Sequence, residues 1–353
     1  MKHTSGDGAA LLRAICDHPD EDTPRLVYAD WLDEQGGESN AARAEFIRIQ
    51  IAEAEKARRK NMQSVGLRSY RIRPVHEREL LRRYIGDWSI DLPMRAGVRY
   101  DNSSEDERFE RGFPWQVHAP DVDTFLKIAP AMFAVAPITY LSLGNLKIGA
   151  ARKLAESPHL ARIRQWQDVY LRRTDKMLAE IGKSPHLANL REIDLTGAQI
   201  TAAGVRALLF APAIRAVTRL CFSSCEIGDE GVEVIAHSPA CANLEHLNLT
   251  YRRTTAVGVR ALAASPARQS MCSLLLTQTQ LDDDATVELA AVEWPRLEYL
   301  LLGVNRLTDR SAEAFLNSAF WRSSGCDLWL TRNQLSDAVK AKLKEVFGPR
   351  VSV

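Results

Sequence analysis

The sequence has no long hydrophobic run and no excess of charge of one sign. No stretch approaches the roughly 20 consecutive apolar residues that a membrane-spanning helix needs. The first residues, Met1 to Gly8, are polar, so we expect no signal peptide and no membrane partner. Lys and Arg number 46 against 45 Asp and Glu, a net charge of +1. This balance argues against a protein built wholly around nucleic acid, although it permits a local basic patch.

The sequence also lacks the motifs of the common enzyme classes. It contains no nucleophile elbow, phosphate-binding loop, HExxH zinc motif or dinucleotide-binding fingerprint. Its six cysteines show no paired metal-ligand spacing, so we expect reduced thiols and a cytoplasmic location. They are Cys16, Cys221, Cys225, Cys241, Cys272 and Cys326. We therefore predict a protein that is not an enzyme and has no cofactor and no metal site.

What the sequence does contain is a repeat in its C-terminal two-thirds. The pattern L-x-x-L-x-L-x-x-N/C-x-L is clear from Leu190, Leu244 and Leu297, and weaker copies share its register. The eight copies start at residues 138, 163, 190, 217, 244, 271, 297 and 325, at intervals of 25, 27, 27, 27, 27, 26 and 28. Chance alternation of apolar residues would not hold such a period.

Each copy predicts one strand followed by one helix. The L-x-L core is a strand whose two leucines point inward, because side chains alternate along a strand. Thr or Asp then caps a helix, and Ser-Pro pairs such as Ser157-Pro158 and Ser238-Pro239 end several helices. One such unit leaves its sides open, so neighbouring units must stack to close the core.

The pattern resembles the leucine-rich repeats of the ribonuclease-inhibitor class over about residues 136–347. The resemblance implies an α/β solenoid of about eight strand–helix units with a parallel sheet on its concave face. In the second unit, Trp166 and Asp168 stand where buried aliphatic residues belong, so we expect that unit to be distorted or out of register. The register also separates Cys221, which faces outward, from Cys225 at a buried turn, and disfavours a shared metal.

Residues 5–58 read as three short helices that form a separate module. The run from Pro24 to Glu34, followed by Ala44 to Gln50, resembles the "repeat-companion" domain found at the N-terminus of bacterial paralogue families. The candidate residues of this motif are Arg25, Asp30, Trp31, Glu45 and Arg48. We expect Asp30 to be partly buried and paired with Arg25, Arg43 or Arg48. This group is interpreted either as an ion pair that fixes helix packing or as a surface that docks a partner.

We divide the chain into four parts on these grounds. Residues 1–58 form the helical module, 59–96 a basic helical connector, 97–135 the cap of the solenoid and 136–353 the repeats. In the cap we expect an irregular strand over 113–118 and a covering helix. Residues 56–83 carry ten Lys and Arg against two Glu, which permits nucleic-acid binding, although charge runs usually mark solvated helix faces.

We expect function to reside on the outward residues of the strands, which line one surface of a solenoid. Tyr, Trp and Arg are the usual anchors of interfaces. The predicted partner-binding residues are Tyr140, Glu192, Arg219, His246, Tyr251, Leu275, Tyr299, Leu301, Trp329 and Arg332. The preferred hypothesis is a non-catalytic scaffold for an unidentified protein partner. The alternatives are a nucleic-acid-binding adaptor acting through residues 56–83, and a regulator of a nucleotide hydrolase by fold analogy alone.

Overall fold

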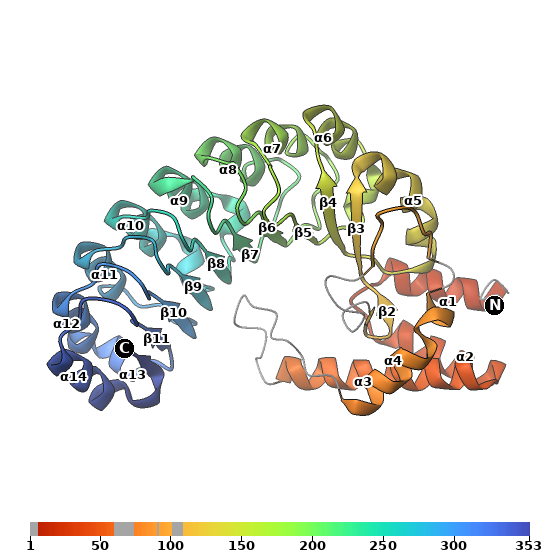
Figure 1. Cartoon of the computed structure of the whole chain (residues 1–353), viewed down its shortest axis with the longest axis horizontal. Helices are drawn as coiled ribbons and strands as arrows, with labels where there is room; N and C mark the ends of the chain where they lie inside the picture. Colours follow the sequence, from red (N-terminus) through yellow and green to blue (C-terminus); the bar gives the residue numbers. More distant parts are fainter. Residues whose placement is uncertain (1–5, 60–73, 90–91, 101–108) are drawn as a thin grey trace. The chain divides into compact units, whose positions relative to one another are not determined.

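A computed structural model describes residues 6–59, 74–89, 92–100 and 109–353 (Figure 1). The chain forms two compact units. The first comprises Met1–Gln63, Leu67–Asn145 and Arg162–Gln165, and the second comprises Ser64–Gly66, Leu146–Ala161 and Trp166–Val353.

The first unit begins with a helical module, as predicted. Its helices are α1 (Gly6–Asp17), α2 (Thr23–Gln35) and α3 (Glu38–Arg59), and α4 (Val75–Trp88) lies in the segment predicted as the connector. Pro24 lies in the first turn of α2, where its missing N–H costs nothing. Gly36, with φ of 68°, ends that helix, because a left-handed residue stops helical propagation. The core between these helices contains Leu12, Ile15, Tyr28, Ala29, Leu32, Ala44, Ile47, Ile51 and Phe113.

The cap of the repeats also belongs to the first unit. It consists of β1 (Phe109–Glu110), β2 (Phe113–Pro114), β3 (Gln116–Asp121) and α5 (Val122–Val135), and it is followed in the same unit by β4 (Tyr140–Asn145), the strand of the first repeat copy. β1 pairs antiparallel with β2, and β3 pairs parallel with β4. Asp121 caps α5 by accepting a hydrogen bond of 2.7 Å from the backbone N–H of Thr124. The strand and the covering helix expected in this segment are therefore both present.

The second unit repeats one strand and one helix. Its strands are β5 (Gln165–Gln167), β6 (Glu192–Asp194), β7 (Arg219–Cys221), β8 (His246–Asn248), β9 (Ser273–Leu275), β10 (Tyr299–Leu301), β11 (Asp327–Trp329) and β12 (Val351–Ser352). Its helices are α6 (Ile148–Ala155), α7 (Asp175–Ile181), α8 (Ala202–Leu209), α9 (Gly228–His237), α10 (Ala256–Ala264), α11 (Asp283–Ala290), α12 (Asp309–Asn317), α13 (Ala319–Ser323) and α14 (Asp337–Phe347). The helices line one side of the strands (Figure 1). Within this unit the strand order is β12-β11-β10-β9-β8-β7-β6-β5.

The predicted register of the repeat is confirmed. Strands β4 to β11 each begin two residues after a predicted start, as β6 does at Glu192 and β10 at Tyr299. Neighbouring strands pair at equivalent positions, so Ile193 lies beside Leu220, and Leu220 beside Leu247. These central residues are at most 2% exposed, and each such buried side chain contributes about 1.5–3 kcal/mol.

The repeat copy that starts at residue 163 keeps this register, so the expectation that this copy is distorted is wrong. Asp168 is fully buried where an aliphatic residue belongs. Its carboxylate accepts hydrogen bonds from Trp166 Nε1 at 2.6 Å and from Arg173 Nε at 2.8 Å. The Arg173 side chain is only 2% exposed. A buried ion pair therefore occupies the space that leucine or phenylalanine fills in the other units, because a buried carboxylate is tolerated only when it is paired.

Carboxylates also latch neighbouring helices together. The backbone N–H of Thr201, which caps α8, donates to Asp175 Oδ1 in α7 at 2.8 Å, and the Thr201 hydroxyl donates to Asp175 Oδ2 at 2.7 Å. The same contacts join Thr255 to Asp229 and Thr308 to Asp283, and Ser336 N–H donates to Asp309. Each carboxylate thus satisfies an otherwise free donor at the next helix N-terminus.

A ladder of polar side chains closes the turns after the strands. Asn305 Nδ2 donates to the carbonyl oxygens of Leu276 and Leu302 at 2.8 and 2.9 Å. Its Oδ1 accepts from the backbone N–H groups of Thr279 and Leu281 at 2.9 and 3.2 Å. Asn333 repeats this role one unit later, where its Oδ1 accepts from Asn305 N–H. The Asn positions of the sequence pattern are therefore structural.

Candidate functional site

The candidate site in the second unit is the outward side of its strands, opposite the helices. Glu192, Arg219, Tyr299 and Leu301 are partly exposed there, and Trp329 is 46% exposed. Alternation along each strand produces this arrangement, because the residues that flank a buried leucine must point the other way. These five side chains are accessible to a large partner.

Three predicted residues of the strand face are less accessible than expected. His246 is 7% exposed and Leu275 is 9% exposed, although both lie on the outward side. In the first unit, Tyr140 is 4% exposed. Its ring lies edge-on to Trp115 at 5.3 Å and tilted against His118 at 5.3 Å. The alternation of a strand predicts the direction of a side chain but not what covers it.

Charge and burial interact at the centre of the strand face. Arg219 Nε lies 3.7 Å from Glu192 Oε1 on the neighbouring strand. On the other side, burial together with the nearby Arg219 cation lowers the pKa of His246 to about 3. His246 is therefore neutral at physiological pH.

The titration of His246 predicts a loss of stability in mild acid. The unfolded residue takes up a proton near pH 6.5 and the folded residue only near pH 3, so the unfolded state binds more protons between these values. Between pH 7 and pH 5 the free energy of unfolding should fall by about 2 kcal/mol on this account. Denaturant titrations at pH 7 and pH 5 should show that the His246→Gln variant lacks this decrease of about 2 kcal/mol in the free energy of unfolding. It should persist in His237→Gln, whose side chain is exposed, and an identical fall in all three proteins would contradict the prediction.

A row of left-handed residues follows the strands. The residue seven positions after a repeat start has positive φ in seven units, and only one of the seven is glycine. They are Tyr170, Gly197, Ser224, Tyr251, Gln278, Val304 and Arg332. Left-handed backbone costs a residue with a side chain about 1–2 kcal/mol. The units therefore retain side chains where glycine would be less strained.

Several side chains of this left-handed row are exposed. Tyr170 is 75% exposed, Tyr251 is 54% exposed and Val304 is 37% exposed. Of this row, the sequence predicted Tyr251 and Arg332 as binding residues and left Tyr170 and Val304 out. The missed signal is one position of the repeat at which large or branched residues replace the expected glycine.

Of the five motif residues of the N-terminal module, Asp30 and Arg48 contact each other, and Arg25, Trp31 and Glu45 contact other residues. Arg48 Nη2 donates to Asp30 at 2.6 Å and to Asp33 at 2.8 Å. The Asp30 side chain is 69% exposed, so the expectation of partial burial is wrong, and Arg48 is its partner among the three candidates. The buried Arg25 instead donates to the carbonyl oxygens of Glu21 and Pro19, which fixes the loop before α2.

The other motif residues serve packing and surface contacts. Trp31 stacks on Tyr28 with ring centroids 5.5 Å apart. It also lies against Gly8, where an added Cβ would stand 2.6 Å from the Trp31 ring. Exposed Glu45 contacts His76 Nε2 at 2.8 Å.

The basic segment over 56–83 lies partly outside the described residues, because residues 60–73 are among those not described. Within the part that is described, Lys56 pairs with Glu53 at 2.7 Å and Arg83 pairs with Glu38 at 2.7 Å. These two cations therefore have acidic neighbours. A nucleic-acid interface in this segment stays a prediction.

The described residues contain no group of three or more His, Cys, Asp and Glu side chains placed to hold a metal ion. All six cysteines are free. Burial raises the pKa of Cys225 to about 11 and that of Cys221 to about 12, so neither is a reactive thiolate at neutral pH. In the same described regions, every helix is too short or too polar to cross a bilayer.

The strand–helix units define a leucine-rich-repeat solenoid preceded by a small helical module. Residues 186–209 and 216–236 match the family model described as "Leucine Rich repeat". Among solved structures, an internalin from Listeria monocytogenes is similar, with 13% identity, a TM-score of 0.37, and coverage of 64% of this chain and 69% of that one. A chain of the yeast Rad7–Elc1 complex is similar at 15% identity and a TM-score of 0.35, covering 66% and 70%. No curated protein matches the sequence.

Proposed function

We propose that this protein is a non-catalytic scaffold that binds a protein partner on the strand face of its repeats. The observation that carries the proposal is the left-handed row, in which exposed side chains are kept at a cost in backbone energy. Tyr251 and Arg332 of this row join Trp329, Leu301 and Tyr299 as the expected contact residues. Glu192 on β6 and Arg219 on β7 extend the same face. Exposed aromatic and arginine side chains are the groups that anchor interfaces.

The remaining parts of the chain have supporting roles in this proposal. Residues 1–58 act as a repeat-companion-like module of a bacterial protein, 59–96 as a connector, 97–135 as the cap and 136–353 as the binding solenoid. The six free thiols favour a reducing compartment such as the cytoplasm.

The test of the proposed function is quantitative capture with matched variants. The purified protein is immobilised, proteins recovered from a lysate are quantified by mass spectrometry, and the capture is repeated with Tyr251→Ser/Trp329→Ser/Arg332→Ser. A strand-face partner should be recovered at least about tenfold less by this variant, since a few anchors carry most binding energy. The control is Phe210→Ser/Val257→Ser, which should leave recovery unchanged. Phe210 follows the last residue of α8 and Val257 lies in α10, and the two residues are 45% and 48% exposed.

Hydrogen exchange on the purified complex gives a second reading of the same question. The proposal expects protection of the strands and of the turns that follow them. Protection confined to helices α7 to α12, or equal losses in both variants, would exclude the strand face as the binding surface.

The strain in the left-handed row makes a separate prediction about stability. Replacing Tyr251 by glycine removes a left-handed penalty of about 1–2 kcal/mol and adds a chain-entropy cost of about 0.5–1 kcal/mol. The free energy of unfolding should therefore rise by up to about 1 kcal/mol, while partner recovery falls. Urea denaturation measures the first effect, and a loss of stability in Tyr251→Gly would show that the side chain is needed for folding instead.

A further inference from the structure

Arg43 is a buried cation that makes no ion pair with a carboxylate of the described residues. It lies in α3 and is 7% exposed. Among the described residues, nothing accepts a hydrogen bond from its Nη1, which is itself inaccessible to solvent. Burial lowers the pKa of Arg43 to about 10, yet the side chain stays charged at neutral pH. An isolated buried charge is costly, so a cation kept in this condition points to an anion that completes the site.

Aromatic rings hold the Arg43 guanidinium in place. Its Cζ lies 5.0 Å from the ring centroid of Trp88, 4.9 Å from that of Phe109 and 5.3 Å from that of Phe113. Ring faces stabilise a cation, but they accept no in-plane N–H bonds of the kind a carboxylate accepts. The rings therefore position the guanidinium without accepting hydrogen bonds from its N–H groups.

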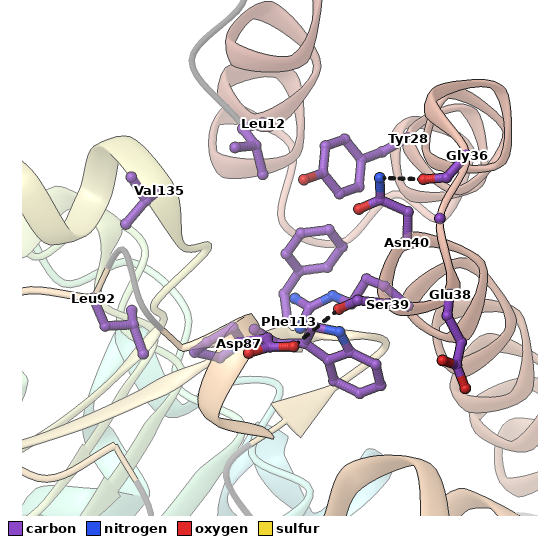
Figure 2. A pocket seen from close by; sticks show the side chains of 14 residues that line it. Leu12, Tyr28, Gly36, Glu38, Ser39, Asn40, Asp87, Leu92, Phe113 and Val135 are labelled. Carbon is purple, nitrogen blue, oxygen red and sulfur yellow. Dashed lines mark hydrogen bonds between the residues drawn. The ribbon is translucent and has the colours of Figure 1, made fainter. Parts of the chain in front are cut away.

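A pocket of about 440 Å³ opens beside this cation in the first unit, with Arg43 and Trp88 in its wall. Trp88 Nε1 is a second buried donor that lacks an acceptor among the described residues. Leu12, Leu92 and Val135 contribute apolar surface, and Figure 2 shows them on the side of the pocket away from Glu38. Two buried donors without an acceptor among the described residues thus belong to the wall of a pocket that has an apolar side, which favours a ligand with an acceptor group and an apolar body.

The N-terminus of α3 forms the polar side of the pocket. Gly36 and Gly37, with φ of 68° and 90°, turn the chain into this 22-residue helix. Its first free N–H groups favour negative charge nearby. In Figure 2, the Asn40 side chain bonds back to the Gly36 carbonyl at 2.8 Å, which fixes the turn.

Two carboxylates at the pocket limit the charge that it can accept. Glu38 pairs with Arg83 at 2.7 Å, and Asp87 accepts a hydrogen bond from Ser39 Oγ at 3.3 Å (Figure 2). A phosphate group carries up to two charges and would be repelled by both carboxylates, because like charges disfavour each other at this range. A singly charged carboxylate meets less repulsion from them and still pairs with the planar guanidinium fork.

We propose that this pocket binds a carboxylate carried on an aromatic or branched aliphatic body, with Arg43 as the anion-binding residue. The carboxylate belongs either to a free small acid or to the C-terminus of a peptide, which share this chemistry. The ligand occupies the first unit, so the site is independent of the strand face of the repeats.

The test uses benzoate as the probe and benzamide as its neutral analogue, titrated into the full chain by calorimetry. Benzoate should bind at one site per chain with a dissociation constant of about 1 mM, and benzamide at least about tenfold more weakly. Arg43→Met should weaken benzoate binding by at least about tenfold. Arg48→Met is the matched control, because Arg48 lies on the same helix and pairs with Asp30 and Asp33, and it should bind benzoate as the wild type does.

The two sources of the carboxylate are separated by a peptide arm. A short peptide ending in phenylalanine is compared in its free-acid and amidated forms, and preference for the free acid over benzoate identifies a peptide terminus as the ligand. The reverse order identifies a small acid. Equal binding of benzoate and benzamide to the wild-type chain, or equal binding of benzoate to wild type and Arg43→Met, overturns the proposal. The first of these comparisons does not depend on the folding of any variant.

Discussion

Replacing Asp168 by alanine is expected to lower the free energy of unfolding by about 3–5 kcal/mol. The substitution leaves the Arg173 guanidinium buried beside a cavity, and it removes the acceptor of Trp166 Nε1. Urea denaturation followed by circular dichroism measures the change. The effect should be a lower midpoint at an unchanged slope, because the fold itself is retained in the native state.

A double substitution tests the interpretation of the pair. Asp168→Leu/Arg173→Leu restores the aliphatic pattern of the other units, and it should recover most of the stability that Asp168→Ala loses. The control is Asp284→Ala, which breaks an exposed ion pair of 2.7 Å with Arg310 and should cost less than about 1 kcal/mol. A double variant as unstable as Asp168→Ala would show that the ion pair has a role beyond filling this space.

The second large effect is expected at Asn305. Alanine at this position leaves two buried backbone carbonyl groups and two buried N–H groups without the partner that Asn305 supplies. Each such loss costs about 1–3 kcal/mol if the structure does not relax. Relaxation of the turns recovers part of this cost, so we expect a total of about 3–5 kcal/mol. Thermal and urea unfolding both measure it.

The chemistry of the Asn305 amide can be separated from its size. Asn305→Asp preserves the shape but turns the two donated hydrogen bonds into contacts between oxygen atoms, so it should be at least as harmful as alanine. Asn317→Ala, at an exposed asparagine in the same unit, should change stability by less than about 0.5 kcal/mol. If Asn305→Asp were as stable as the wild type, the ladder would not stabilise these turns.

The strands could be predicted from sequence because one pattern fixes them all. Ile193, Leu247 and Leu300 repeat at nearly equal intervals, and each must enter the same core. Asp168 could not be interpreted in the same way. Its partner, Arg173, lies five residues later in a turn, and a pattern that evaluates one position at a time cannot represent a compensated pair.

Exposure was harder to predict than direction. Leu275 faces outward as the alternation requires, but it stays buried, and Tyr140 is covered by Trp115 from the preceding segment. In the helical module, Asp30 was assigned a partly buried face and instead lies exposed beside Arg48. Such errors arise because burial depends on neighbours that a local pattern does not contain.

The pocket around Arg43 was out of reach of the sequence for a related reason. Arg43 stood only as a possible partner for Asp30. Its aromatic neighbours, Trp88, Phe109 and Phe113, follow it by 45 residues or more, and no motif links such distant rings to a helix N-terminus. Only the packing of the first unit brings them together.

The latches between helices imply that the smallest exchangeable piece of this array is two units long. Asp175 meets Thr201, Asp229 meets Thr255 and Asp283 meets Thr308, so over residues 163–324 the contact joins alternate pairs of neighbours, and Asp309 with Ser336 adds a further contact to the last unit. Excising residues 217–270 removes both members of one pair together. Excising 244–270 alone would bring Asp282, the cap of α11, to the place of Thr255 and set two carboxylates against each other. A gene lineage that lengthens or shortens the array between residues 163 and 270 should therefore do so in steps of 54 residues.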